Sequence, residues 1–406
     1  MSIKDKNIIM VIYSILDYVV LFFYSVLVFD SIVSNSSIPC SIDIKSIITI
    51  IYKLLLIISI LKIFYYYDDD SKKARRAIVL YIFIMIMDIL GICNYWMVAI
   101  PIVAVYNIKF KKIASCYAVV GTVSLCTVIL YAVSEVILND YDVSTVAGKL
   151  FVMGFWGHNG AMTFLFFILM AIFYLIQNAK FELIIVIVSM IITLVLFEFT
   201  KSKTSTALLL IICILLIIKW LFNKLFGVLV WERVHNLFCK TLIFTPLYAI
   251  VLDVLGILYG GRYGYSKGPW TLMDRYVMSY SALNKLGVKM PFSSIKSDEL
   301  LDVSFNFIFG LGGKDYPAQE YFDIEYVNIF INFGFVFLIP YLLMQFFALY
   351  RLYKLQEWRL LLFFSFMIWY GCFERSVLLF TVCGIFLLTM FCDTRHIGSV
   401  DNNEYT

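Results

Sequence analysis

Long apolar runs separated by short polar segments repeat along almost the whole chain. Most runs are about 17–25 residues long, the length that a helix needs to cross a bilayer. Because lipid offers no partner to backbone polar groups, each run is predicted to form a helix. The runs predict twelve spans, near residues 8–29, 46–66, 77–92, 94–107, 113–137, 161–177, 182–199, 205–222, 241–258, 322–349, 360–373 and 376–392.

The stretch 77–107 admits two interpretations, one long span or two short spans joined at Gly91–Tyr95. No A-x-A-type cleavage site follows the first run, so that run is expected to be a retained helix and not a signal peptide. The predicted organisation is nine helices in 1–258, one large extracytoplasmic loop at 259–321, and helices ten to twelve with a cytoplasmic tail in 322–406. The expected fold class is therefore all-α, a polytopic integral membrane protein of about twelve transmembrane helices.

Composition and charge support this prediction. Hydrophobic residues make up 62% of the 406 residues and charged residues 15%, whereas soluble domains have about 25% charged residues. Short cytoplasmic loops carry an excess of Lys and Arg. With the N-terminus inside, the inner segments hold 19 of the 32 Lys and Arg residues, and the short outer connections hold five. We therefore expect a multi-pass protein of the cell membrane with both termini in the cytoplasm, and two spans within 77–107.

One polar stretch, Tyr259–Phe322, interrupts the apolar pattern and falls on the outer side in this topology. A loop of this length translocates regardless of its charge. Basic and aromatic residues are interleaved along it: Arg262, Lys267, Arg275, Lys285, Lys289, Lys296 and Lys314 lie among Tyr263, Tyr265, Trp270, Tyr276, Tyr280, Phe292, Tyr316 and Tyr321. A large basic, aromatic-rich loop between late helices indicates a segment that handles a substrate.

Part of this loop, Pro269–Leu286, has the pattern of an amphipathic helix. Its apolar positions recur at helical spacing, at Leu272, Tyr276, Tyr280 and Leu283. We expect this helix to lie along the outer membrane surface. Arg275 falls in its first turn, where a guanidinium could bind a phosphate through two parallel hydrogen bonds. Alternatively, Arg275 only contacts solvent or lipid headgroups.

Two lysines, Lys201 and Lys203, occupy the tight turn Thr200–Thr204 between two short spans. Two cations in so short a hairpin could hold an anionic headgroup. Alternatively, their ammonium groups only extend to the membrane interface, as lysines at helix ends often do.

Three carboxylates lie where the chain re-enters the membrane: Glu320, Asp323 and Glu325. Carboxylates at the end of a span are costly if they face lipid. They are therefore expected to face a protein cavity, where one could act as a general base toward a hydroxyl. Alternatively, these charges only fix the position where the span starts.

His158, before the sixth span, is likewise either functional or structural. Three more acidic residues lie inside spans, and the sequence pairs none of them: Asp17, Asp88 and Asp253.

Metal and phosphate-loop motifs are not found in the sequence. The nine cysteines show no CxxC or Cys/His ligand spacing, so neither a metal site nor a disulfide framework is predicted. Gly310–Gly313 is not part of a GxxxxGKS phosphate loop and is interpreted as a turn. We expect no cofactor, no metal and no nucleic-acid partner.

Four segments, taken in order, resemble motifs of the Wzy-type membrane polysaccharide polymerases, which are related to the O-antigen ligases. The resemblance extends from about Val152 to Thr389. Gly154–Asn159 resembles the family's Gly-Phe-x-His-Pro-Asn stretch, and Lys201–Thr204 resembles its Ser-Arg-Thr turn. Leu272–Arg275 resembles its Leu-x-Gly-Arg segment, and Asp323–Val327 with the later Gly334 resembles its His-Asn-x-Tyr-Leu motif. The first segment lacks the proline, Lys203 replaces an arginine, and Asp274 replaces a glycine. Asp323 stands where ligases have a histidine, which favours a polymerase over a ligase.

The resemblance implies a glycan transfer on the outer face of the membrane. The donor would be a glycan on a polyprenyl diphosphate, and the acceptor would be the terminal sugar hydroxyl of another lipid-linked repeat unit. Arg275 and Lys203 would hold the charge of the leaving diphosphate, with Lys201 and Arg262 as alternatives. Side-chain cations would supply this electrostatic term, so no metal is implied.

The resemblance also implies a base and a glycan path. Asp323 would accept the proton of the acceptor hydroxyl, with Glu325 or Glu320 as alternatives. Trp270 and the loop tyrosines, Tyr276 among them, would stack on sugar faces, and His158 would also contact substrate. Membrane lipid surrounds the protein, and a chain-length regulator and a flippase of the same pathway are candidate partners.

Three rival functions remain. One is a membrane receptor whose loop binds a ligand without chemistry. A ligase would move the glycan to a different acceptor. A flippase or transporter of the lipid-linked sugar would carry charged residues near the bilayer midplane and two similar halves. The sequence shows no clear internal repeat, and its charges concentrate near the outer rim, which favours an enzyme.

Overall fold

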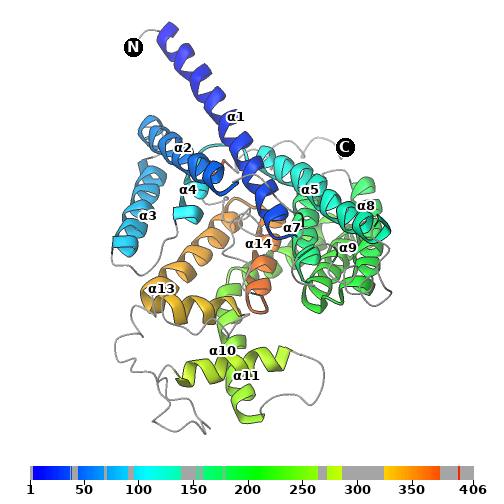
Figure 1. Ribbon diagram of the computed structural model, residues 1–406. Helices are drawn as coiled ribbons and strands as arrows, with labels where there is room; N and C mark the ends of the chain where they lie inside the picture. The colour runs from blue at the N-terminus through cyan, green and yellow to red at the C-terminus, as the bar shows by residue number, and fades with distance from the viewer. Residues whose placement is uncertain are drawn as a thin grey trace. The chain divides into compact units, whose positions relative to one another are not determined.

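The computed structural model describes residues 3–36, 38, 44–67, 71–89, 96–138, 153, 155, 159–176, 179–263, 272–285, 324–374 and 392–393. Within these ranges every regular element is an α-helix, as Figure 1 shows. In chain order the helices are α1 (Ile3–Ser34), α2 (Ile44–Tyr65), α3 (Ser71–Ile89), α4 (Trp96–Ala104), α5 (Phe110–Leu138), α7 (Gly160–Leu175), α8 (Ala179–Thr200), α9 (Lys203–Leu242), α10 (Thr245–Tyr263), α11 (Leu272–Lys285), α13 (Glu325–Lys354) and α14 (Trp358–Gly371).

Six helices in the described residues are long and apolar enough to cross a membrane. They are Val11–Ser34, Ser46–Tyr65, Phe110–Glu135, Phe181–Thr200, Lys203–Phe222 and Phe333–Lys354. The end of α9 and α10 together form a seventh candidate, bent by 54°. The prediction of a helical, multi-pass membrane protein is therefore confirmed. The count of twelve spans stays a prediction, because nearly all of the last expected span, 376–392, lies outside the described residues.

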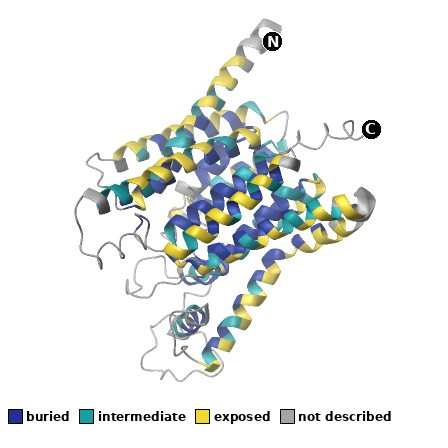
Figure 2. Ribbon diagram, turned by 90° about the vertical axis from the view of Figure 1, so that its right-hand side faces the viewer, coloured by how far each residue is buried: buried dark blue, intermediate teal, exposed yellow. Residues whose placement is uncertain are grey.

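Apolar side chains cover the outer faces of several helices. On α8, Phe181, Ile184, Ile191 and Val195 are each more than half exposed. Figure 2 shows such exposed positions on the same helices as buried ones. Soluble proteins rarely expose large apolar surfaces, whereas lipid tails accept them. These faces are those expected to meet the bilayer.

The chain divides into two compact units. Unit 1 comprises Met1–Val79, Met97–Leu237 and Leu379–Thr406, and unit 2 comprises Leu80–Trp96 and Phe238–Leu378. In unit 1, α5 packs against α1 and α7, α1 also packs against α2, and α7 against α8. In unit 2, α10 packs against α11, α13 and α14, and α13 also packs against α14.

Four helices differ from the sequence prediction. The stretch 77–107, expected to hold two spans, contains α3 and α4 in its described residues, and neither is among the candidate spans. Helix α9 continues through 223–240, which was expected to be an inner connection, because charged residues there end an apolar run without ending a helix. In α13, Gly334 has φ 64° and ψ −169°, a non-helical conformation that favours glycine and kinks the helix. The membrane-crossing part of α13 accordingly begins at Phe333, later than the expected span 322–349.

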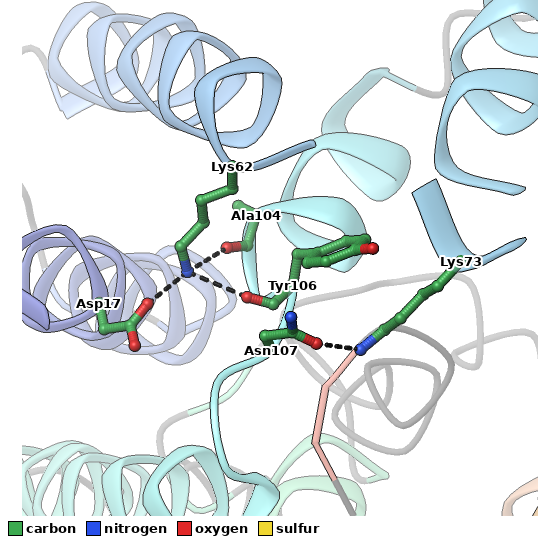
Figure 3. Close-up of polar contacts among 6 residues, drawn as sticks. All are labelled: Asp17, Lys62, Lys73, Ala104, Tyr106 and Asn107. Carbon is green, nitrogen blue, oxygen red and sulfur yellow. Dashed lines mark hydrogen bonds and ion pairs between the residues drawn. The ribbon is translucent and has the colours of Figure 1, made fainter. Parts of the chain in front are cut away.

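A buried charge network holds four helices of unit 1 together (Figure 3). Lys62 on α2 is fully buried, and its Nζ lies 2.5 Å from Oδ1 of Asp17 on α1. The same ammonium donates to the carbonyls of Ala104 (3.3 Å) and Tyr106 (3.2 Å), at and just beyond the end of α4. Three acceptors thus meet the three N–H groups of the ammonium. Last-turn carbonyls lack intrahelical partners, so Lys62 also caps α4.

Lys73 on α3 extends this network. Its Nζ donates to Oδ1 of Asn107 at 2.6 Å and lies 4.6 Å from the centre of the Tyr106 ring. The Tyr106 ring stacks on Tyr66 at 5.7 Å. The segment after α4 is therefore held by charged or aromatic groups from α3 and from the end of α2.

A double-mutant cycle on Asp17 and Lys62 tests the pair. Lys62→Met leaves the Asp17 carboxylate without its cation, so we expect a loss of about 3–5 kcal/mol in the free energy of unfolding in detergent. Asp17→Leu combined with Lys62→Met should recover part of that loss, because no unpaired charge remains. As a matched control, Lys201→Met removes the exposed pair with Glu198 and should cost under about 1 kcal/mol. A double variant less stable than Lys62→Met would contradict the pairing.

Glu357, in the turn before α14, is expected to make the stability of the folded protein depend on pH. Its side chain is buried, and burial raises its pKa from 4.5 to about 7, outweighing the favourable field of the helix start. The folded protein keeps this proton to about pH 7, whereas the unfolded chain releases it near its ordinary pKa. Stability should therefore fall as pH rises through this window.

We expect Glu357→Gln to reduce the fall in melting temperature between about pH 5 and pH 8. The control Glu198→Gln, at an exposed carboxylate, should change that fall little. An unchanged fall in Glu357→Gln would show that another group titrates.

Candidate functional site

Three glycines of α10 let α11 dock closely against it. A Cβ at Gly256 would lie 2.4 Å from the Tyr276 ring, one at Gly260 2.9 Å from the backbone nitrogen of Val277, and one at Gly261 2.1 Å from the Tyr280 ring. Real Cβ atoms do not approach other atoms so closely, so a side chain at any of these positions would force its neighbour to shift. Figure 1 shows α11 lying across α10.

The predicted amphipathic helix is present as α11, and its apolar side packs against protein. Tyr276, Tyr280 and Leu283 form a buried cluster with residues of α10 and the start of α13: Ile257, Ile324, Val327 and Ile331. This cluster fixes the face of α11 and hence the place of Arg275. Its position on the outer membrane surface remains a prediction.

Arg275 already binds oxygen atoms in the structure. Its Nη1 lies 2.9 Å from Oε1 of Glu374 and also donates to the carbonyl of Phe373. Both partners belong to the turn that follows α14, where the amides of Phe373 and Glu374 donate back to Tyr370. A cation is favoured next to the last carbonyls of a helix. The side chains of Arg275 and Glu374 are 17% and 10% exposed, so the pair is mostly but not fully buried.

A buried carboxylate lies beside the docked face of α11. Tyr276 donates a long hydrogen bond of 3.5 Å to Oδ1 of Asp253, near the middle of α10. Burial raises the pKa of Tyr276, and the Asp253 charge raises it further, so the phenol stays protonated and remains a donor. Oδ2 of Asp253 and Oγ of Ser279 are buried without a hydrogen-bond partner among the described residues.

The start of α13 brings further polar groups into unit 2. Glu325, its first residue, is 1% exposed. The hydroxyl of Tyr326 donates to Oε1 of Gln345 at 3.1 Å. Asp323 lies just outside the described residues, two positions before Glu325.

The structure brings together some of the predicted site residues. Arg275 and Tyr276 lie on α11, and the first turns of α13, where Glu325 lies, pack against the apolar side of that helix. Arg262 is exposed at the end of α10, with its guanidinium 5.5 Å from the Tyr263 ring. Glu320, Asp323, His158 and Trp270 lie outside the described residues.

The predicted lysines belong to unit 1 and are described separately. Lys201, at φ 51°, is exposed and pairs with Glu198 at 2.5 Å. Lys203 begins α9 and is also exposed. The Oγ of Ser202, between them, is buried without a hydrogen-bond partner in the described part of the chain.

Sequence reasoning missed Glu374 as a site residue and left Asp253 without a partner. Glu374 lies 99 positions from Arg275, and no local pattern connects the two. Asp253 carried a usable signal, a lone acid within an apolar run. Within the described ranges, no group of three or more His, Cys, Asp or Glu residues could hold a metal ion.

No protein-family model, curated protein or solved structure matches the chain. The functional proposal therefore rests on the residues and their geometry.

The glycine contacts give a prediction for α11. Gly260→Ala places a methyl group against the backbone of Val277, which cannot rotate away, so α11 must shift. We expect a loss of about 1–3 kcal/mol in the free energy of unfolding, with faster amide exchange in α11. The control Gly121→Ala meets mainly the flexible Ile168 side chain and should cost less. Equal losses in both variants would contradict a close backbone approach.

Proposed function

We propose that the protein is a membrane glycosyltransferase that polymerises lipid-linked oligosaccharide repeat units. The donor is a glycan on a polyprenyl diphosphate, and the acceptor is the terminal sugar hydroxyl of another lipid-linked unit. The reaction takes place at the outer face of the cytoplasmic membrane, and both termini are cytoplasmic. Its twelve-span topology, with the long outer loop after the ninth span, belongs to the same proposal.

The observation that carries the proposal is the environment of Arg275. Its helix docks at Gly260 and Gly261, near the end of α10, which is part of a bent candidate span. The guanidinium contacts a carboxylate and a carbonyl, so it is placed to bind oxyanions. In the proposed topology the end of α10 reaches the outer headgroup region, where the diphosphate of a lipid-linked donor lies.

The transfer needs charge stabilisation and a base. The acceptor oxygen attacks the anomeric carbon, and the carbon–oxygen bond to the diphosphate breaks with its electron pair on the diphosphate. Arg275 holds that charge, with Arg262 as a further cation. The resemblance also implies roles for Lys203, Lys201 and His158, which belong to unit 1. Asp323 takes the acceptor proton, with Glu325 or Glu320 as alternatives. No metal is required by this scheme. Trp270 contacts the glycan, whereas Tyr276 is buried in the cluster of α10, α11 and α13.

A flippase for the same lipid-linked sugar is the second candidate, and one observation favours it. Asp253 is 3% exposed near the middle of α10, and acidic residues within spans often mark transport pathways. A ligase that transfers the glycan to another acceptor would use the same donor chemistry.

The lipid-linked glycans of a deletion strain separate these functions. Loss of the polymerase should leave single repeat units on the lipid at the outer leaflet. Full-length chains retained on the lipid would indicate a ligase, and absence of lipid-linked sugar from the outer leaflet would indicate a flippase.

Substitutions of Arg275 in the complemented strain test the site. Arg275→Ala should abolish chain extension while the protein remains in the membrane. Arg275→Lys should be nearly as damaging, because the planar fork of donors is lost. In contrast, Lys203→Arg should be partly tolerated, since the family pattern has arginine there. Polymer of normal length from Arg275→Lys would reduce this residue to a general surface charge.

A further inference from the structure

The structure contains an anion at the position where the proposed function needs one. Oε1 of Glu374 lies 2.9 Å from Nη1 of Arg275, within the range of charge-assisted hydrogen bonds. A carboxylate and a phosphoryl group both present anionic oxygens to a guanidinium. A phosphate that binds this guanidinium must therefore compete with Glu374.

The turn that carries Glu374 can release the side chain without unfolding α14. Backbone hydrogen bonds from Phe373 and Glu374 to Tyr370 hold the turn independently of Arg275. The pair is mostly but not fully buried, with side-chain exposures of 17% for Arg275 and 10% for Glu374. In the Lys62–Asp17 pair the carboxylate is 23% exposed, but the ammonium is fully buried and also bonds two backbone carbonyls.

We propose that Glu374 is a built-in competitor that occupies Arg275 until a diphosphate displaces it. This inference rests on the proposed function, in which Arg275 receives the donor diphosphate. A membrane leaflet also presents anionic phosphodiester headgroups, each with one negative charge. Such a headgroup offers no more charge than the carboxylate, which is tethered and so present at high effective concentration. The diphosphate link of a glycan donor carries two negative charges and can displace Glu374.

Glu374 thus acts by competing with other anions for the Arg275 guanidinium, and not by attracting a ligand. A tethered competitor lowers the apparent affinity of every anion for Arg275 by the same factor. A headgroup that binds weakly is thereby kept from occupying Arg275, whereas a dianion that binds tightly still does. Without the carboxylate, Arg275 would bind monoanionic headgroups more tightly and would be occupied by them.

Binding to purified protein in detergent tests this role. The probes are undecaprenyl diphosphate and short-chain phosphatidylglycerol, measured with the wild type, Glu374→Gln, Arg275→Gln and the double variant. Glutamine keeps the size and an acceptor oxygen but removes the charge. Glu374→Gln should bind phosphatidylglycerol roughly tenfold tighter or more, the size of effect of one charge-assisted contact. Its gain for the diphosphate should be of similar size, because both anions displace the same carboxylate, and both gains should vanish in the double variant.

The outcomes separate this inference from the proposed function. If Arg275→Gln binds the diphosphate as tightly as the wild type, the proposed role of Arg275 fails. If Arg275→Gln loses that binding but Glu374→Gln keeps the wild-type affinity for both probes, only the role of Glu374 fails. The control Glu135→Gln, at a partly buried carboxylate of α5, should leave both affinities unchanged.

A second measurement uses the wild type and does not depend on the stability of a variant. Carbodiimide labelling of the Glu374 carboxylate should increase when undecaprenyl diphosphate is added, because the side chain leaves Arg275. Phosphatidylglycerol at the same concentration should increase it little. Unchanged or reduced labelling with the diphosphate would overturn the displacement.

Discussion

Lipid supplies no counter-charge and no hydrogen-bond partner, so each charge inside a helical membrane protein must find its partner in the protein. Three of the described pairs follow this constraint by joining different helices. Lys62 joins α2 to α1 and to the end of α4, Lys219 of α9 lies 3.8 Å from Glu182 of α8, and Arg275 joins α11 to the turn after α14. Apolar packing between helices surrounded by lipid is less directional, so these pairs specify which helices meet.

The pairs differ in how many acceptors surround the cation and in how far water reaches it. The Lys62 ammonium has an acceptor for each N–H and is fully buried, which suits a permanent connection. Arg275 is partly exposed and uses Nη1 for both of its contacts with the turn. The same type of interaction thus serves architecture in unit 1 and ligand selection in the proposed site of unit 2.

The sequence predicted what local periodicity encodes. Apolar runs located the membrane helices, and the spacing of Leu272, Tyr276, Tyr280 and Leu283 located α11 with Arg275 in its first turn. It could not predict the partners of Arg275 or Asp17, because contacts between distant segments leave no trace in the spacing along one helix. It also divided α9, because hydropathy reports where lipid is tolerated and not where the backbone hydrogen bonds end. The predicted base, Asp323, lies outside the described residues.

The conformation of Gly334 has a consequence for how such a site can change. The kink separates the first turns of α13, which carry Glu325 and pack beneath α11, from the part that crosses the membrane. The two parts of one helix therefore serve as separate modules. Substitutions before Gly334 can change the residues at the edge of the site, while the part of α13 that crosses the bilayer keeps its sequence and its depth.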